Sequence, residues 1–222
     1  MSEPPPPRNR PAHPALLAAM VKRVLALERM PSATTRAIVG IVGAPGSGKS
    51  TLAAAVVTAL GPTAALVGLD GFHLAQRVLD DRGLAEVKGA PETFDADGYL
   101  NLLTRLRKPP DGRTIYAPEF RREIEEPIAG AIAVPPTAEV IITEGNYLLL
   151  DTAPWAGVRA VASEVWFLDT PEDLRVRRLI ERHIRYGRSP EAARERAESG
   201  SDARNAALVL ASREHADVLL QP

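Results

Sequence analysis

The sequence predicts an α/β protein in which helices flank a central parallel sheet. Short apolar runs rich in β-branched residues recur along the chain, and stretches with helical spacing of apolar residues lie between them. Continuous apolar runs of this kind are typical of strands buried on both faces of a parallel sheet. Strands that alternate with helices indicate the α/β class, and the 222 residues are enough for one domain with one core.

The chain begins with a segment that is unlike the rest. Residues 1–14 hold six prolines and no apolar stretch, which favours a disordered tail with polyproline-II character and excludes a signal peptide. Residues 15–222 are predicted to form a single domain. A ligand for a proline-binding partner is the alternative interpretation of the tail.

The remaining elements follow from the apolar pattern in chain order. A helix is expected over 15–30, where apolar residues recur at helical spacing. Strands are expected over 37–42, 64–69, 140–143, 165–168 and 216–220. Further helices are expected over 50–60, 96–107, 171–186, 190–198 and 203–214.

Composition excludes several classes of function. The chain has 27 Lys+Arg against 28 Asp+Glu, so a strongly basic nucleic-acid or membrane-surface protein is not expected. It has no cysteine, which excludes disulfides, thiolate metal sites and cysteine nucleophiles. No apolar run approaches the roughly 20 residues that span a bilayer. We expect a cytoplasmic protein with no nucleic-acid or membrane partner, and a homodimer remains open.

The strongest local motif follows the first predicted strand. It fits the pattern G-x-x-x-x-G-K-[ST] between a strand and a helix, which is the P-loop of the P-loop NTPase fold, and comprises Gly43, Ala44, Pro45, Gly46, Ser47, Gly48, Lys49, Ser50 and Thr51. Backbone N–H groups of such a loop bind a polyphosphate. Lys49 is expected to reach the β- and γ-phosphates and the Ser50 hydroxyl to bind Mg²⁺. The expected cofactors are therefore ATP and Mg²⁺.

Three predicted strands end in carboxylates, at the edge where open α/β sheets bind ligands. Asp70 is the candidate base for a substrate hydroxyl. Glu144 has the place of an acid that holds magnesium through water. Asp169 precedes a helix start and is expected to have a structural or capping role. Each carboxylate alone is equally compatible with a solvated or capping residue.

A predicted helix over 171–186 carries a row of arginines. Arg175, Arg178, Arg182 and Arg185 are spaced to share one helix face. One interpretation is a solvated basic face; the other is a lid that delivers guanidinium groups to transferring phosphates. On the lid interpretation Arg182 acts in catalysis, and Arg178, Arg182 and Arg185 bind the nucleotide.

Several motifs together resemble a known family. They are the P-loop, Leu69–His73 (LDGFH), Lys88–Asp95 (KGAPETFD), Ile115–Arg121, Glu144–Leu150 (EGNYLLL), Glu181–His183 and Ser201–Ala206. The chain is identified as similar to the phosphoribulokinase, uridine kinase and bacterial pantothenate kinase superfamily, and most similar to its nucleoside kinase-like, fructose-transport-system kinase-like branch. The resemblance implies a sheet with an arginine-bearing lid. It also implies Mg·ATP-dependent phosphorylation of a small metabolite's hydroxyl, with Asp70 as the catalytic carboxylate.

Acceptor-binding candidates lie beside these motifs. They are Asp70, Phe72, His73, Lys88, Tyr116, Arg121 and Asn146. The aromatic residues are equally compatible with core packing, His73 with a structural histidine, and Lys88 with a surface lysine. Arg121 and Arg122 can form local ion pairs, and Asp202 and Asn205 are expected to cap a helix.

The acceptor itself is less defined than the reaction. Uridine kinases carry a histidine near the place where Phe120 and Arg121 stand here. Phosphoribulokinases need a basic cluster for the acceptor's phosphate, for which Arg121 and Arg122 are the candidates in this chain. A nucleoside is the favoured acceptor, and a sugar or a pantothenate-like alcohol is the alternative. An ATP-binding regulatory switch without a small-molecule acceptor is the alternative of another class.

Overall fold

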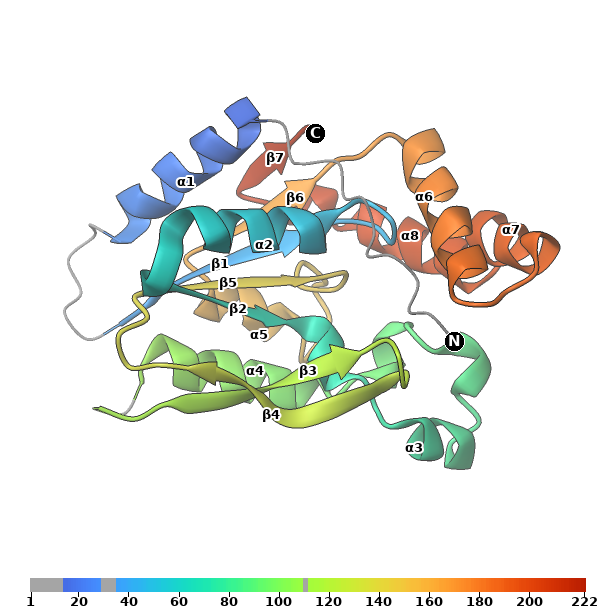
Figure 1. Cartoon of the computed structure of the whole chain (residues 1–222), viewed down its shortest axis with the longest axis horizontal. Helices are drawn as coiled ribbons and strands as arrows, with labels where there is room; N and C mark the ends of the chain where they lie inside the picture. Colours follow the sequence, from blue (N-terminus) through green and yellow to red (C-terminus); the bar gives the residue numbers. More distant parts are fainter. Residues whose placement is uncertain (1–13, 29–34, 110–111) are drawn as a thin grey trace, which may run out of the picture.

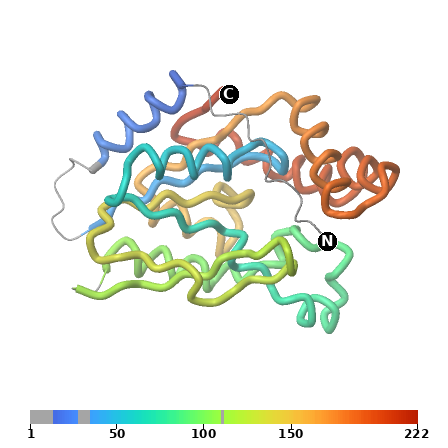
Figure 2. Tube along the Cα trace, viewed as in Figure 1, coloured from blue at the N-terminus to red at the C-terminus, as the bar shows by residue number. Residues whose placement is uncertain are grey.

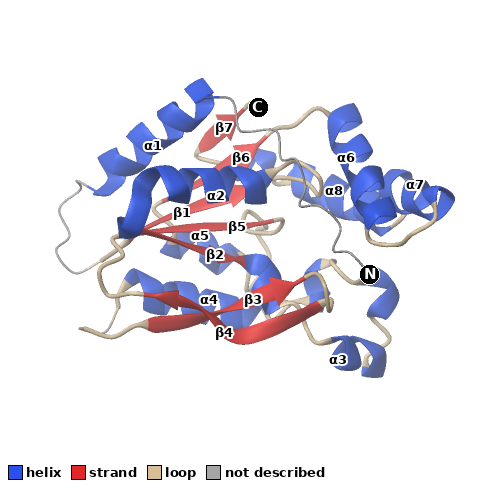
Figure 3. Cartoon of the chain, viewed as in Figure 1, coloured by secondary structure: helices blue, strands red, loops and turns tan. Residues whose placement is uncertain are grey.

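A computed structural model describes residues 14–28, 35–109 and 112–222. Its centre is a five-stranded parallel sheet in the order β2-β5-β1-β6-β7 (Figures 1 and 3). The strands are β1 (Ala37–Val42), β2 (Ala64–Gly68), β5 (Val140–Gly145), β6 (Glu164–Leu168) and β7 (Val218–Leu220). The predicted fold class is confirmed. The carboxyl ends of β1, β2 and β5 therefore lie together at one edge of the sheet.

Helices cover both faces of the sheet. On one face α1 (Pro14–Glu28) and α2 (Lys49–Leu60) pack against side chains such as Val39 and Ile41 of β1. On the other face α4 (Ala96–Arg107), α5 (Ala156–Val161) and α8 (Ser201–Ala211) pack against Ile38 and Val42. This alternation along β1 follows from the two-residue side-chain period of a strand. Figure 2 shows that α1 and β7 lie on the same side of the molecule although they come from opposite ends of the chain.

The sequence did not predict an antiparallel hairpin, which the structure contains. It consists of β3 (Ile115–Arg121) and β4 (Glu126–Val134), a separate two-stranded sheet beside the main one (Figure 1). Each strand contains a proline, Pro118 and Pro127, and the register shifts between Ala117 and Glu119. Proline has no N–H group for the hydrogen bonds between strands, so strands that contain proline are hard to predict from a sequence.

Three further helices complete the domain. They are α3 (Gln76–Asp81), α6 (Glu172–Arg185) and α7 (Pro190–Glu198). Figure 1 places α6 and α7 at the same end of the molecule as α3 and the P-loop. In the predicted tail, residues 1–13 lie outside the described residues, and Pro14 belongs to α1 rather than to the tail because it starts that helix. Among the described residues no helix combines the length and apolar character needed to cross a membrane.

Candidate functional site

The P-loop connects β1 to α2 in the conformation that its glycines allow. Gly46 and Gly48 have φ of 84° and 96°, and α2 begins at Lys49. A Cβ at Gly46 would lie 2.6 Å from the carbonyl oxygen of Arg175 in α6, so only glycine fits beneath this helix. The loop is therefore held between the start of α2 and α6, with the α2 N-terminus available for an anion.

A hydroxyl and a carboxylate meet beside the loop. Ser50 Oγ donates a hydrogen bond to Glu144 Oε1 at 3.1 Å, and the Glu144 residue is only 7% exposed. Burial raises the pKa of Glu144 above its ordinary value, against the opposing charge of Lys49. Two hard oxygen donors on neighbouring elements fit Mg²⁺, which takes few protein ligands and completes its shell with water and phosphate oxygens. The residues predicted for the metal are thus brought together.

Lys49 lies close to both acidic groups. Burial lowers the pKa of its ammonium, while the charges of Glu144 and Asp70 oppose that shift. The charges of Glu144 and Asp70 thus favour the protonated ammonium at the carboxyl edge of the sheet, whereas burial disfavours it. A polyphosphate bound by the loop would find its compensating charge here.

Asp70 lies in a short 3-10 turn, Leu69–Phe72, directly after β2. Its Oδ2 accepts a hydrogen bond from Arg122 Nη2 at 3.0 Å. Its side chain is 34% exposed, so the carboxylate remains accessible from outside. Burial alone would favour protonation, but the charges of His73, Arg122 and Lys49 hold the pKa of Asp70 below its ordinary value. Asp70 is therefore an ionised acceptor of protons beside the P-loop lysine.

The hairpin packs directly on this turn. A Cβ at Gly71 would lie 2.4 Å from the Pro118 carbonyl oxygen, so the two backbones are in close contact. Phe120 stacks at 4.7 Å from the ring of His73, and Lys88 Nζ lies 5.5 Å from the Phe120 ring centroid. His73 Nδ1 also donates a hydrogen bond to the Asp70 carbonyl oxygen at 2.8 Å. An aromatic and cationic surface thus borders Asp70.

The other acceptor candidates differ in their burial and in their partners. Phe72 is partly buried against the core, with its ring edge on Tyr99. Tyr116 is 62% exposed, so it does not fill core. Arg121 is exposed and pairs with Glu119 at 3.0 Å, whereas its neighbour Arg122 reaches Asp70. These placements leave the roles of Phe72, Tyr116 and Arg121 as predictions.

Asn146 follows β5, at the end of the sheet where Glu144 lies. Its Oδ1 atom is buried and has no hydrogen-bond partner among the described residues. A buried amide oxygen without a partner is costly, which indicates that a donor from a ligand or water completes it. Its assignment to the acceptor stays a prediction.

The arginine row of α6 does not form a uniform solvated face. Arg175 is 3% exposed and its Nη1 approaches the Pro45 carbonyl oxygen at 3.4 Å. Arg178 Nη1 donates to the Ser47 carbonyl oxygen at 3.1 Å. Burial lowers the pKa of Arg182, and the nearby charge of Arg122 adds to that shift. Arg185 is exposed. The inner arginines therefore lie along the P-loop and reach toward the acceptor side.

A second network joins the helices after the lid to the loop that carries Lys88. Asn205 Nδ2 donates to the Gly89 carbonyl oxygen at 3.1 Å, and Arg196 Nη2 donates to the Lys88 carbonyl oxygen at 3.1 Å. The hydroxyl of Tyr147 also donates to Gly89. The expectation that Asn205 caps a helix is wrong, because its amide satisfies a carbonyl of a loop 116 residues earlier.

The capping prediction for Asp202 is also wrong, whereas Asp169 has the structural role that was expected as the alternative to a cap. α8 begins at Ser201, before the predicted start, and Asp202 instead pairs with His183 at 2.6 Å. Asp169 makes no cap on α6 and accepts from Arg213 Nη2 at 2.6 Å. In each case a side chain from another element competes with the local backbone for the carboxylate.

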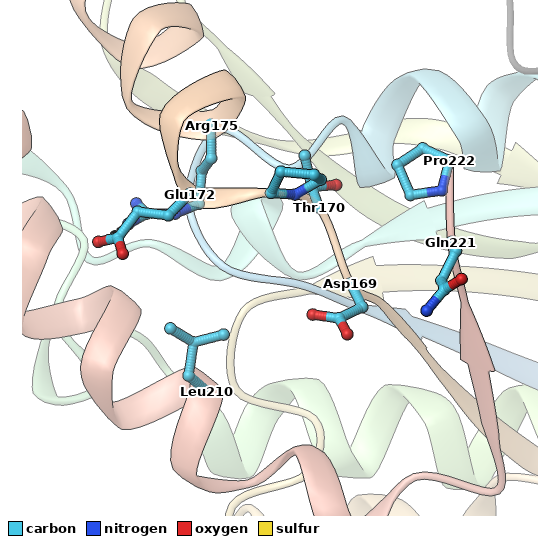
Figure 4. A pocket seen from close by; sticks show the side chains of 8 residues that line it. Asp169, Thr170, Glu172, Arg175, Leu210, Gln221 and Pro222 are labelled. Atoms are coloured by element: carbon cyan, nitrogen blue, oxygen red, sulfur yellow. Dashed lines mark hydrogen bonds and ion pairs between the residues drawn. The ribbon is translucent and has the colours of Figure 1, made fainter.

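A cavity of about 470 Å³ lies beside the P-loop, where β6 and β7 end and α6 begins (Figure 4). Figure 4 shows Asp169, Leu210 and Gln221 around this space, together with Arg175. Thr170, also in its wall, donates to the Ser47 carbonyl oxygen at 3.0 Å, so the cavity is directly connected to the loop. Its volume is in the range of small-ligand sites.

Sequence reasoning gave Phe120 no place in the site, and it left Arg122 open between a basic cluster for an acceptor phosphate and a local ion pair. Both lie in or beside the hairpin, which the apolar pattern did not reveal. The sequence Phe-Arg-Arg contains the signal, but local spacing could not decide which arginine faces Asp70. Only the strand register and the turn after Arg121 settle that choice.

Comparison with known proteins defines the family. Residues 38–221 match the model described as the Phosphoribulokinase / Uridine kinase family. The C227.14 protein of Schizosaccharomyces pombe, provisionally named a uridine kinase, is 34% identical over 161 residues, or 68% of either chain. YggC of Escherichia coli is 32% identical over 191 residues, covering 84% of this chain and 78% of its own.

A crystal structure from Silicibacter sp. TM1040 has a closely similar fold. It is provisionally described as a fructose transport system kinase and is 40% identical to this chain. Its TM-score is 0.81, with 92% of this chain and 98% of the other covered. The names of these relatives differ in the acceptor that they suggest.

Proposed function

The chain belongs to the phosphoribulokinase/uridine kinase family and is a small-molecule kinase, and we propose that it transfers a phosphoryl group from Mg·ATP with Asp70 as the general base. The observation that carries this proposal is the position of Asp70. It is an accessible, ionised carboxylate beside Lys49 and next to the hairpin. An acceptor hydroxyl there would meet both a base and a phosphate-binding loop.

The proposed reaction transfers the γ-phosphoryl group of ATP directly to the acceptor hydroxyl. The acceptor O–H bond breaks, its proton passes to Asp70, and the oxygen forms a bond to the γ-phosphorus. The bond between that phosphorus and the β–γ bridging oxygen breaks, and ADP leaves with the electron pair. Lys49 and Arg182 would neutralise charge on the transferring group. When bound at Ser50 and Glu144, Mg²⁺ would supply charge stabilisation and orientation of the phosphates.

The cavity beside the P-loop is the proposed site of the nucleotide base. Leu210, Pro171 and Pro222 offer apolar contact, and Gln221 offers an amide that can hydrogen-bond to a ring edge. The cavity opens at Arg175, whose guanidinium already touches the P-loop. This support is strongest for a purine, because the space is large and partly apolar.

A nucleoside acceptor, expected from the sequence, stays a prediction beside a sugar or pantothenate-like alcohol. No residue around Asp70 favours the regulatory switch. A cytoplasmic location and a homodimer likewise stay predictions, as does the expectation that neither nucleic acid nor membrane is a partner.

The test is ADP formation by the full chain with Mg·ATP, alone and with each of a panel of alcohols, sugars, nucleosides and sugar acids. We expect one class of acceptor to stimulate ADP release and to yield a phosphate ester of the correct mass. D70N should reduce this transfer by about 100-fold or more and leave ATP binding unchanged. Undiminished transfer in D70N would refute the base assignment, and acceptor-independent turnover across the panel would favour the switch.

A further inference from the structure

The Asp70 carboxylate is already paired with Arg122 in the structure, and this pairing affects which acceptors can bind. The ion pair of Arg122 Nη2 with Asp70 Oδ2 covers one of the two carboxylate oxygens at 3.0 Å. A carboxylate that is paired with a guanidinium accepts a proton less readily than a free one. An acceptor that removed Arg122 from Asp70 would therefore activate the base as it bound.

Arg122 is well placed to move. It lies in the turn between β3 and β4, and its side chain is 38% exposed. Besides Asp70, its described contact is with the face of Phe120, 5.8 Å from the ring centroid. A cation on an aromatic face can slide toward a new partner while it keeps that contact. The guanidinium can thus turn from Asp70 to a group of the ligand.

The acidic side chains around Arg122 are already engaged elsewhere. Glu126 accepts from the backbone N–H of Gln76 at 3.0 and 3.2 Å, and Glu119 pairs with Arg121. Glu125 lies 3.9 Å from Lys88 Nζ. Of the carboxylates in the described part of the chain, Asp70 is thus the one that Arg122 contacts within ion-pair distance.

Further positive charge faces the same place. Lys88, 15% exposed at its side chain, is fixed by Gln76 Oε1 at 3.1 Å and by the Glu125 carbonyl oxygen at 2.7 Å. Arg182 of α6 is subject to the same charges: besides burial, the charge of Arg122 lowers its pKa, and the charge of Asp70 opposes that shift. Two guanidinium groups from separate elements converge where an oxyanion would relieve their repulsion.

We propose that the acceptor carries an oxyanion, a carboxylate or a phosphate, near the hydroxyl that is phosphorylated, and that Arg122 leaves Asp70 to bind it. This inference rests on the proposed function and names the substrate class of the same site. A neutral acceptor would have to break the Arg122–Asp70 pair without providing a replacement, which costs the free energy of a charge-assisted hydrogen bond. An anionic acceptor exchanges one carboxylate partner of Arg122 for another.

The experiment uses pairs of acceptors that share a hydroxyl and differ in the anion. The carboxylate pair is glycerol with D-glycerate; the phosphate pairs are glycerol with sn-glycerol 3-phosphate and fructose with fructose 6-phosphate. For each pair that reacts, we expect the anionic member to have a kcat/KM about tenfold to 100-fold higher. The two kinds of pair distinguish a carboxylate from a phosphate. Equal or better transfer to the neutral members would overturn the inference and leave the proposed function intact.

A charge-removing variant locates the effect. R122Q should remove the preference for the anionic member: kcat/KM for anionic acceptors falls about tenfold to 100-fold, whereas kcat/KM for neutral ones does not fall, because no Arg122–Asp70 pair then has to break. R113Q, which removes the same charge from an exposed position just before β3, is the matched control. If R122Q weakened both members of a pair equally, Arg122 would only position Asp70 and the inference would be wrong.

Calorimetry separates binding from transfer. Each pair is titrated into the full chain saturated with Mg²⁺ and a non-hydrolysable ATP analogue, in the wild type and in R122Q. Tighter binding of the anionic member that depends on Arg122, without any phosphate ester in the kinetic assay, would support the inference and refute the proposed function. Failure of every anionic member to bind more tightly than its neutral partner would refute the inference.

Discussion

The contact between the Asp70 turn and the hairpin can be tested with G71A. A Cβ at Gly71 would lie 2.4 Å from the Pro118 carbonyl oxygen and 2.8 Å from the Pro118 carbonyl carbon. Both atoms belong to the backbone, so they cannot rotate away as a flexible side chain can. The turn and β3 must separate by about 1 Å before the closest pair reaches an ordinary contact distance. Asp70 and Phe120 would then move apart.

The expected magnitudes follow from this displacement. Overpacking at a close backbone contact costs about 1–3 kcal/mol of the free energy of unfolding. A misplacement of about 1 Å costs about 100-fold in kcat/KM for the acceptor. The KM for ATP should change by less than about threefold, because the P-loop packs against α6 instead of the hairpin. Steady-state kinetics at saturating Mg·ATP and urea unfolding measure the two effects.

G130A is the matched control in the same hairpin. Gly130 has φ of 67° but open space around a new Cβ, so the substitution strains the backbone without displacing Asp70. It should cost about 1 kcal/mol of stability and leave kcat/KM for the acceptor unchanged. A G71A protein that kept kcat/KM within about twofold of the wild type would refute the reasoning that the hairpin sets the acceptor site.

Three further predictions concern other parts of the fold. E144Q should raise the Mg²⁺ concentration needed for half-maximal ADP formation about 10- to 100-fold, and an unchanged magnesium titration would exclude this residue from the metal site. Arg23 pairs with Glu164 at 2.6 Å and, despite the opposing effect of burial, their hydrogen bond holds the pKa of Glu164 below its ordinary value. Because the folded-state pKa is lowered, the pair stabilises at neutral pH, and its contribution is lost as pH falls through that pKa. R23Q should therefore cost about 0.5 kcal/mol in urea unfolding at pH 7 and less at about pH 3; an equal cost at both would contradict this. N205A removes the donor to the Gly89 carbonyl oxygen and should raise the KM for the acceptor several-fold with the KM for ATP unchanged, whereas a shift in ATP alone would place this contact on the nucleotide side.

The nucleotide half of the site was predictable because it is local in the sequence. The P-loop lies in one run of nine residues between a strand and a helix, and its glycines have the positive φ that the motif requires. Asp70 and Glu144 were found because parallel strands deliver their carboxyl ends to one edge. The apolar patterns of β1 and α2 predict the same strand–loop–helix arrangement, so the local motif and the overall fold agree.

The acceptor half was not predictable in the same way. Arg122 contacts Asp70 across 52 residues, and Asn205 contacts Gly89 across 116. Contacts between residues so far apart in the chain cannot be recognised from the local periodicity of helices or strands. The spacing of the α6 arginines showed that they share a face, but only packing shows that Arg175 and Arg178 lie on the P-loop. Tertiary contacts of this kind also displaced the predicted caps at Asp202 and Asn205.

This division explains why the family defines the reaction and leaves the acceptor open. The groups for ATP come from consecutive chain and strand ends, which any chain with this sheet and motif can reproduce. The groups proposed for the acceptor come from the hairpin, the Lys88 loop and α6–α8, whose described contacts converge at Asp70 and at Lys88–Gly89. A substitution in one of these segments can change the charge opposite the acceptor without disturbing the P-loop. On the proposed function, the substrate class depends on side chains such as Arg122 that face Asp70 from outside the sheet, so it has to be argued from their charge and partners in this chain.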